Sequence, residues 1–175
     1  DIKSQWDAKE LGSKHNAEWD LLINEYSKMH PELYNELERL INNELPNDFE
    51  TLYEEFLEGL VAGDQKDLAT RKASEICLNF FCEHLPELVG GSADLTGSNN
   101  TYSSASSEML PDNPQGNHIF YGVREFGMTA MMNGMLLHGG IKPEGGTFLV
   151  FMDYAMNAVR LAALMEIPNI FVYTH

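Results

Sequence analysis

Apolar side chains recur every three or four positions through the first part of the chain, which is the spacing of one face of an α-helix. The clearest stripe, within a helix predicted over residues 16–29, consists of Trp19, Leu22, Ile23 and Tyr26. A second helix is predicted over 31–41, because Pro31 suits a first helical position. A third is predicted over 48–63, with Asp48 as its N-cap. The first part of the chain is therefore expected to be helical.

Beyond residue 68 the long stripes give way to short apolar runs separated by helical stretches. Strands are predicted over 88–91, 118–121, 147–150 and 169–174. Helices are predicted over 70–84, 125–138 and 152–165, with Thr70 as the N-cap of the first. Strands separated by helices of this length are typical of a parallel sheet covered on both faces. The sequence therefore predicts an α/β fold for residues 69–175, preceded by a helical segment over 1–68.

Ligands of parallel α/β sheets bind beyond the carboxyl ends of the strands. Thr174 and His175 follow the last predicted strand, so they lie where a site is expected. The chain stops at this position. This leads us to expect that the 175 residues belong to a longer protein.

Charge and composition narrow the range of functions. The chain has 11 basic and 27 acidic side chains, a net charge of −16, and 17 of the acidic residues lie within residues 1–68. Such a charge repels a nucleic acid backbone or an anionic membrane surface, so neither partner is expected. The two cysteines, Cys77 and Cys82, lie five apart in a predicted helix and point to different faces. Reduced thiols of this kind predict a cytoplasmic protein.

Glu125 is the first candidate for chemistry. It stands at a predicted strand-to-helix transition, within the segment YGVREFGM that begins at Tyr121. A carboxylate in this position often interacts only with the helix dipole. The alternative is a partly buried acid that holds or exchanges a proton with a ligand nitrogen. The residue pattern alone leaves both interpretations open.

Three aromatic residues, Phe148, Phe151 and Tyr154, lie at a predicted strand end and the start of the next helix. Their spacing fits either core packing or the wall of an aromatic slot. The chain lacks the glycine fingerprints of nucleotide-binding loops, the histidine spacing of zinc enzymes and the serine elbow of hydrolases. No site of those three kinds is therefore predicted, and no metal ligand is assigned within the chain.

Several segments, in order and spacing, closely resemble the transketolase family of thiamine diphosphate enzymes. They are RKAS from Arg71, GGSADLTGSN from Gly90, YGVREFGM from Tyr121, NGMLLHGG from Asn133, GTFLVFMDYAMNAVRLAALM from Gly146 and VYTH at the end. The resemblance covers roughly residues 69–175, and it identifies them as the first part of a pyrimidine-binding domain. Residues 1–68 resemble the linker that precedes that domain, with WDAK from Trp6 as a weaker marker.

The resemblance implies a role for each candidate residue. The counterpart of Glu125 bonds N1′ of the cofactor's aminopyrimidine and promotes loss of the thiazolium C2 proton, after which a two-carbon ketol unit passes from a ketose phosphate to an aldose phosphate. This is a reaction of the pentose phosphate pathway. Phe148, Phe151 and Tyr154 match the aromatic pocket around the pyrimidine. Asp94 matches a residue near the cofactor at the subunit interface. Arg71, Ser98 and His175 match groups that hold the sugar phosphate.

The chain also departs from the family pattern. The GDG motif of the diphosphate and metal site is absent, so Mg²⁺ or Ca²⁺ is expected to bind a domain outside this chain, and the chain alone is expected to be inactive. The family site forms between two subunits, so a homodimer is implied. A competing hypothesis is a stand-alone interaction module that binds through its acidic helices. A related synthase or dehydrogenase component is a further alternative, although Arg71, Ser98 and His175 favour phosphorylated sugars.

Overall fold

The computed structural model describes residues 1–63 and 67–175, so residues 64–66 of the predicted helical segment lie outside the described part. Its helices are α1 (Ile2–Trp6), α2 (Lys9–Met29), α3 (Pro31–Ile41), α4 (Phe49–Ala62), α5 (Thr70–His84), α6 (Thr96–Asn99), α7 (Glu125–His138) and α8 (Met152–Leu164). Its strands are β1 (Leu88–Ser92), β2 (His118–Phe120), β3 (Lys142–Phe148) and β4 (Ile170–Thr174). A short 3₁₀-helix, η1 (Leu149–Phe151), joins β3 to α8.

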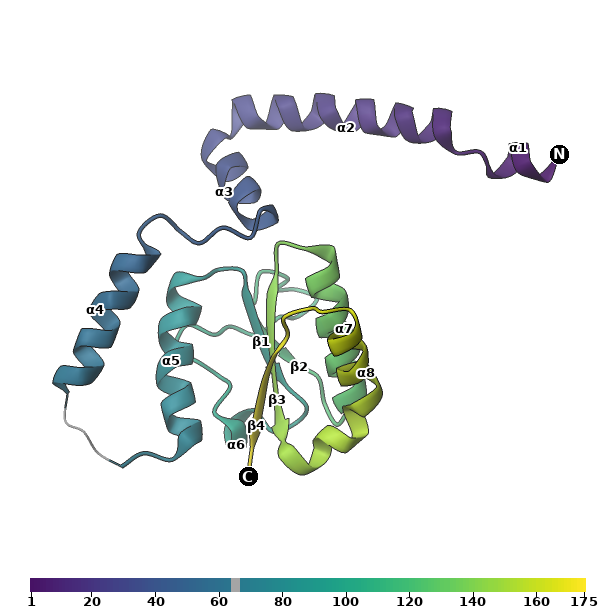
Figure 1. Ribbon diagram of the computed structural model, residues 1–175. Coiled ribbons are helices and arrows are strands. Elements are labelled where there is room, and N and C mark those ends of the chain that lie inside the picture. Colours follow the sequence, from purple (N-terminus) through teal and green to yellow (C-terminus); the bar gives the residue numbers. More distant parts are fainter. Residues whose placement is uncertain (64–66) are drawn as a thin grey trace.

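The four strands form one parallel sheet in the order β2-β1-β3-β4. Helix α5 lies on one face of this sheet, and helices α7 and α8 lie on the other (Figure 1). The predicted α/β class, with a parallel sheet covered on both faces, is therefore confirmed. Because all strands run the same way, their carboxyl ends meet at one edge, where α6 and the chain terminus also lie (Figure 1).

On the α7 side, the core is built around two methionines that are completely buried, Met128 and Met132. They lie directly over Gly145 of β3, where an added Cβ would come within 2.4 Å of the Met132 sulfur. Only a residue without a side chain permits so close an approach of helix and strand. The methionines of this helix thus serve packing, as their flexible side chains suit irregular space.

On the α5 side, a second cluster joins the helical segment to the sheet. Phe49 of α4 packs with Phe80 of α5 at a ring-centroid distance of 5.9 Å, and Leu88 of β1 belongs to the same cluster. Arg39 of α3 donates to both carboxylate oxygens of the buried Glu87, at 3.1 and 3.0 Å. Helices α3 and α4 are therefore anchored to the α/β part by apolar and ionic contacts.

Helices α1 and α2 extend away from the sheet (Figure 1). Neither contains a buried residue. The predicted apolar stripe of α2 forms, but Trp19 remains 55% exposed and Leu22 59% exposed. The three- and four-residue spacing of apolar side chains thus predicted the helix correctly. It did not predict that the apolar face would be left exposed.

Two local expectations were wrong, and a third, for Asp48, is confirmed in position but without the capping hydrogen bond. The strand predicted over 147–150 ends at Phe148, begins earlier at Lys142 and is followed by η1. Thr70 does not cap α5: Ala69 holds the extended backbone of the N-cap, and Thr70 is the first helical residue. Asp48 occupies the N-cap of α4 but accepts no capping hydrogen bond from the residues the structure describes.

Both cysteines are free thiols, as the sequence predicted; Cys82 is buried and Cys77 is half-buried. Among the described residues, no helix is both long and apolar enough to cross a membrane.

Candidate active site

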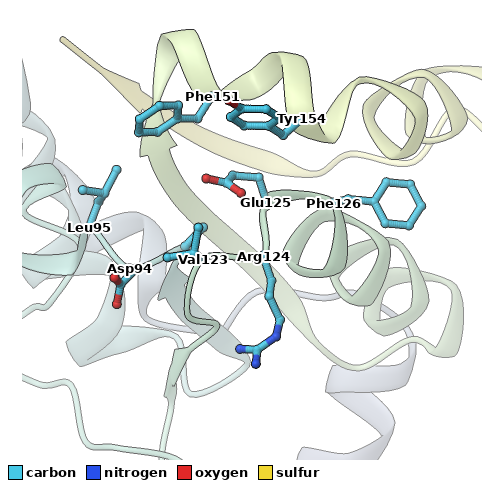
Figure 2. Close-up of a pocket in the computed structure, with 9 residues that line it drawn as sticks. Asp94, Leu95, Val123, Arg124, Glu125, Phe126, Phe151 and Tyr154 are labelled. Carbon is cyan, nitrogen blue, oxygen red and sulfur yellow. The ribbon is translucent and has the colours of Figure 1, made fainter.

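A pocket of about 620 Å³ opens at the carboxyl edge of the sheet (Figure 2). Its walls come from the loop after β1, the turn between β2 and α7, and the start of α8. The lining residues are Ala93, Asp94, Leu95, Val123, Arg124, Glu125, Phe126, Phe151 and Tyr154. This is the edge at which parallel α/β sheets bind their ligands.

Glu125 is the first residue of α7 and is only 7% exposed. Its carboxylate extends into the pocket below the rings of Phe151 and Tyr154 (Figure 2). The neighbouring Arg124 points away from it, and its guanidinium donates to the carbonyl oxygen of Tyr121 at 3.0 Å (Figure 2). Within residues 1–63 and 67–175, no lysine or arginine forms an ion pair with Glu125. The carboxylate is thus left for a ligand.

The turn before α7 directs Glu125 into the pocket. Gly122 has a φ of +66°, a left-handed conformation that residues with a Cβ rarely adopt. A Cβ at this position would also lie 2.6 Å from a guanidinium nitrogen of Arg124. The chain therefore reverses sharply after β2, and α7 begins with its acidic residue at the sheet edge.

The three aromatic candidates form a series rather than a single slot. The rings of Phe148 and Phe151 are stacked at 5.8 Å and 22°, and those of Phe151 and Tyr154 at 6.0 Å and 28°. Phe151 and Tyr154 line the pocket with Glu125, whereas Phe148 lines a second, smaller pocket. At its other side, Phe148 meets the His175 ring edge-on at 4.7 Å.

Asp94 also lines the main pocket, with a φ of +61°. Such a backbone conformation is uncommon for a residue other than glycine and is often found at binding sites. Its carboxylate is directed away from Glu125 (Figure 2). The two acids therefore do not form a pair that shares a proton.

The second pocket, of about 280 Å³, brings together Arg71, Ser98 and His175. These residues come from the start of α5, from α6 and from the end of β4. A guanidinium nitrogen, Nη1 of Arg71, contacts Nε2 of His175. A fixed cation, a hydroxyl and an imidazole thus lie around one space, which is a donor set suited to an anion.

Sequence analysis did not single out several lining residues. In the main pocket these are Ala93, Leu95, Val123, Arg124 and Phe126; in the second they are Ala69, Lys72, Gly97 and Asn100. Most of them are next in sequence to a residue that was predicted. Their position beside a predicted site residue could therefore have identified them. No group of three or more histidine, cysteine, aspartate or glutamate side chains is placed to hold a metal ion in the described part of the chain.

Comparisons with known proteins identify the family of the chain. Residues 66–175 match the family model described as transketolase, pyrimidine binding domain. Transketolase 1 of Aliivibrio fischeri is 49% identical over 175 residues, which is 100% of this chain and 26% of that protein. A solved transketolase from Leishmania mexicana superposes with a TM-score of 0.80 at 37% identity, covering 93% of this chain and 23% of that one.

Another solved relative is the Pichia stipitis transketolase in complex with sedoheptulose 7-phosphate. It has a TM-score of 0.81 and 38% identity, and covers 93% of this chain and 24% of that one. The chain therefore spans about a quarter of the length of the relatives it matches. The matched domain model, the whole-chain identity and the shared fold agree with one another: the chain belongs to the transketolase family.

Proposed function

We propose that the main pocket holds the aminopyrimidine end of thiamine diphosphate in a transketolase. The observation that carries this proposal is the buried Glu125 carboxylate, set without a cationic partner in the described chain, beside the rings of Phe151 and Tyr154. An aminopyrimidine ring combines flat aromatic faces with ring nitrogens that hydrogen-bond. Stacked rings and a carboxylate at one wall suit both properties.

Each residue would act by its own chemistry. Glu125 would share a proton with the ring nitrogen N1′ and stabilise it there, and its low exposure strengthens that bond because little water competes. Phe151 and Tyr154 would hold the ring plane, and Asp94 would stand near the cofactor at the subunit boundary. When bound, the cofactor would supply the carbon nucleophile that carries a two-carbon ketol unit from a ketose to an aldose.

The second pocket would hold the phosphate of the sugar. Arg71 contributes a permanent charge, and Ser98 and His175 contribute a hydroxyl and an imidazole at the same space. Phe148 lines this pocket and stacks on Phe151 of the other. One wall of aromatic rings would thus connect the cofactor end of the site to the phosphate end.

The remaining parts of the proposal concern the whole protein. Mg²⁺ or Ca²⁺ and the cofactor diphosphate would bind residues outside this chain, and residues 1–68 would link the two regions. Apolar side chains on the outer sides of α7 and α8, including Met131, Leu137 and Leu164 at 49%, 61% and 66% exposure, support an interface in a homodimer. The reaction would belong to the pentose phosphate pathway of the cytoplasm.

The direct test is a ketol-transfer assay on the complete protein that contains this chain. With thiamine diphosphate, Mg²⁺, a ketose phosphate and an aldose phosphate, we expect the donor to lose two carbons and the acceptor to gain them. Chromatography of the sugar phosphates measures both changes. A protein that binds the cofactor and transfers no ketol unit would contradict the proposal.

Arg71→Ala in the complete protein is expected to raise KM for phosphorylated sugars about tenfold to a hundredfold, because a charge-assisted hydrogen bond contributes ~1.5–3 kcal/mol. Unphosphorylated acceptors should be little affected. Steady-state kinetics with matched sugar pairs measures the difference, and Lys28→Ala, which removes an exposed cation of α2 that lines neither pocket, is the control. Equal weakening of both substrate types would show that Arg71 supports the fold instead.

Residues 1–175 expressed alone are expected to bind thiamine diphosphate weakly and to transfer no ketol unit. They lack the GDG motif for the charged diphosphate, and each lost hydrogen bond to a charged group costs ~1.5–3 kcal/mol. Titration calorimetry with cofactor and Mg²⁺ measures the binding. Micromolar affinity would contradict the division of the site between this chain and the rest of the protein.

A further inference from the structure

Three residues on neighbouring strands form a row across the sheet, on the face that α5 covers. His118 of β2 pairs with Gly90 of β1, and the register of β1 with β3 places Glu144 on the other side of Gly90. His118 is 0% exposed and Glu144 is 1% exposed. Because Gly90 has no side chain, the imidazole and the carboxyl face the same space from opposite sides.

Both polar groups border the position that a side chain at residue 90 would take. An added Cβ would lie 2.7 Å from Oε1 of Glu144 and 3.6 Å from Nδ1 of His118. Within the described residues, Nδ1 and both carboxylate oxygens are buried without a hydrogen-bond partner of normal geometry. Buried polar atoms nearly always have such a partner, in the protein or in ordered water. A partner is therefore expected in the space above Gly90.

The imidazole of His118 is held in place from its other side. Its Nε2 lies 3.3 Å from Oγ1 of Thr96. Its ring also meets the rings of Tyr102 and Phe120 edge-on, each at a centroid distance of 4.9 Å. Rotation of His118 toward Glu144 would break these contacts. Two polar groups that face one space without reaching each other are commonly bridged by water.

The charge of the two groups also favours water over an ion. Burial raises the pKa of the Glu144 carboxyl to about 8 and lowers the pKa of the His118 imidazole to about 4. Between these values both groups are neutral, so an ion would find no opposite charge there. A water molecule both donates and accepts hydrogen bonds, as a neutral carboxyl and a neutral imidazole require.

We propose that an internal water molecule binds above Gly90 and bridges the Glu144 carboxyl and Nδ1 of His118. Through Nε2, His118 connects this bridge to Thr96, the first residue of α6. Helix α6 also carries Ser98 of the second pocket. The water thus ties the segment that lines this pocket to the core of the sheet.

The direct test is a crystal structure of the complete protein at a resolution that shows ordered water. We expect density for one water molecule within hydrogen-bond distance of Glu144 and of Nδ1 of His118. In His118→Phe, which keeps a flat ring and removes both nitrogens, this density should be lost. The proposal is overturned if the wild type has no density at this position, if a side chain from elsewhere in the protein occupies it, or if the density persists in His118→Phe.

Hydrogen exchange of the complete protein measures the bridge in solution. Glu144→Gln would keep a polar group beside the water, so Glu144→Met is used, alone and combined with His118→Phe. Removing one partner leaves the other group buried and unpaired, whereas removing both leaves neither group to be paired. At about pH 6, the amides of β1 and β2 in the double variant should therefore be at least about fivefold better protected than the product of the two single changes predicts.

Thr147→Val is the matched control for this comparison. Thr147 is also fully buried on β3, and its Oγ1 also has no partner among the described residues, but it faces the opposite side of the sheet from Glu144. Its effect on exchange should simply multiply with that of Glu144→Met. A simple product for Glu144→Met and His118→Phe would contradict the bridge. Neither measurement depends on turnover, so either failure is distinguishable from a failure of the proposed function.

Discussion

Replacing Glu125 by glutamine in the complete protein should lower kcat by about 10²–10⁴, the usual contribution of a group that holds or moves a proton in the reaction. Glutamine keeps the size of the side chain and can still hydrogen-bond. It cannot carry the negative charge that stabilises a proton at the ring nitrogen. Because Glu125 is only 7% exposed and has no cationic partner in the described chain, no other group there replaces that charge.

The measurement combines turnover with hydrogen–deuterium exchange at the reactive carbon of the bound cofactor. Asp153→Asn is the matched control, because Asp153 is an exposed carboxylate in the first turn of the neighbouring helix α8. If Glu125 served only the helix dipole, both variants would lose a little stability and neither would lose exchange. Near-normal exchange in Glu125→Gln would therefore contradict the catalytic role.

The second large effect concerns stability and pH, and it arises from Glu144 on β3. This residue is 1% exposed, and burial raises the pKa of its carboxyl from 4.5 to about 8, with only partial compensation from the backbone N–H of Gly91. A raised pKa means that the folded protein holds a proton that the unfolded chain releases. The contribution of Glu144 to stability is therefore complete below pH 4.5 and is lost as the pH rises toward 8.

Glu144→Gln removes this titration, since an amide of similar shape stays neutral at every pH. We expect the variant to gain stability relative to the wild type by up to about 5 kcal/mol between pH 4.5 and 8, from ~1.4 kcal/mol per pKa unit. Urea unfolding of both proteins across this range measures the gain. Glu83→Gln, an exposed carboxylate on α5, is the control and should show no such trend.

His118, on β2, titrates in the opposite sense. Burial lowers the pKa of its imidazole to about 4, so its contribution is present above pH 6.5 and is lost as the pH falls toward 4. This group is common to the wild type and to Glu144→Gln, so the difference between them isolates Glu144. A constant difference across pH would show that the buried carboxyl is ionised throughout.

Local pattern predicted most elements because periodicity and terminal residues are properties of short segments. The apolar stripe of α2 and the proline at the start of α3 are each recognisable within a few residues of sequence. The order and spacing of the segments from Arg71 to His175 then indicated the family and the candidate residues. Neither the elements nor the family required knowledge of which distant segments are in contact in the folded protein.

The start of β3 shows where local pattern failed. Lys142–Gly146 contains a proline, a glutamate and two glycines, which have little preference for a strand. These residues are extended because β1 and β4 pair with them on either side, and because Gly145 leaves room for Met128 and Met132. Such contacts join residues that are far apart in the sequence. They therefore cannot be predicted from any short segment of the chain.

The candidate site, too, was predicted in part from the sequence and decided in part by the tertiary structure. The chain alone indicated the acid, the aromatic residues and the three residues proposed to bind the phosphate, since each stands in a recognisable segment. Folding separated Phe148 from the pocket of Glu125, brought Arg71 beside His175, and joined Asn99 to Thr174 across 75 residues. The sequence determines which side chains are present. The orientation of a ring and the partner of a buried amide depend on the tertiary structure, because parallel strands from distant parts of the chain end at one common edge.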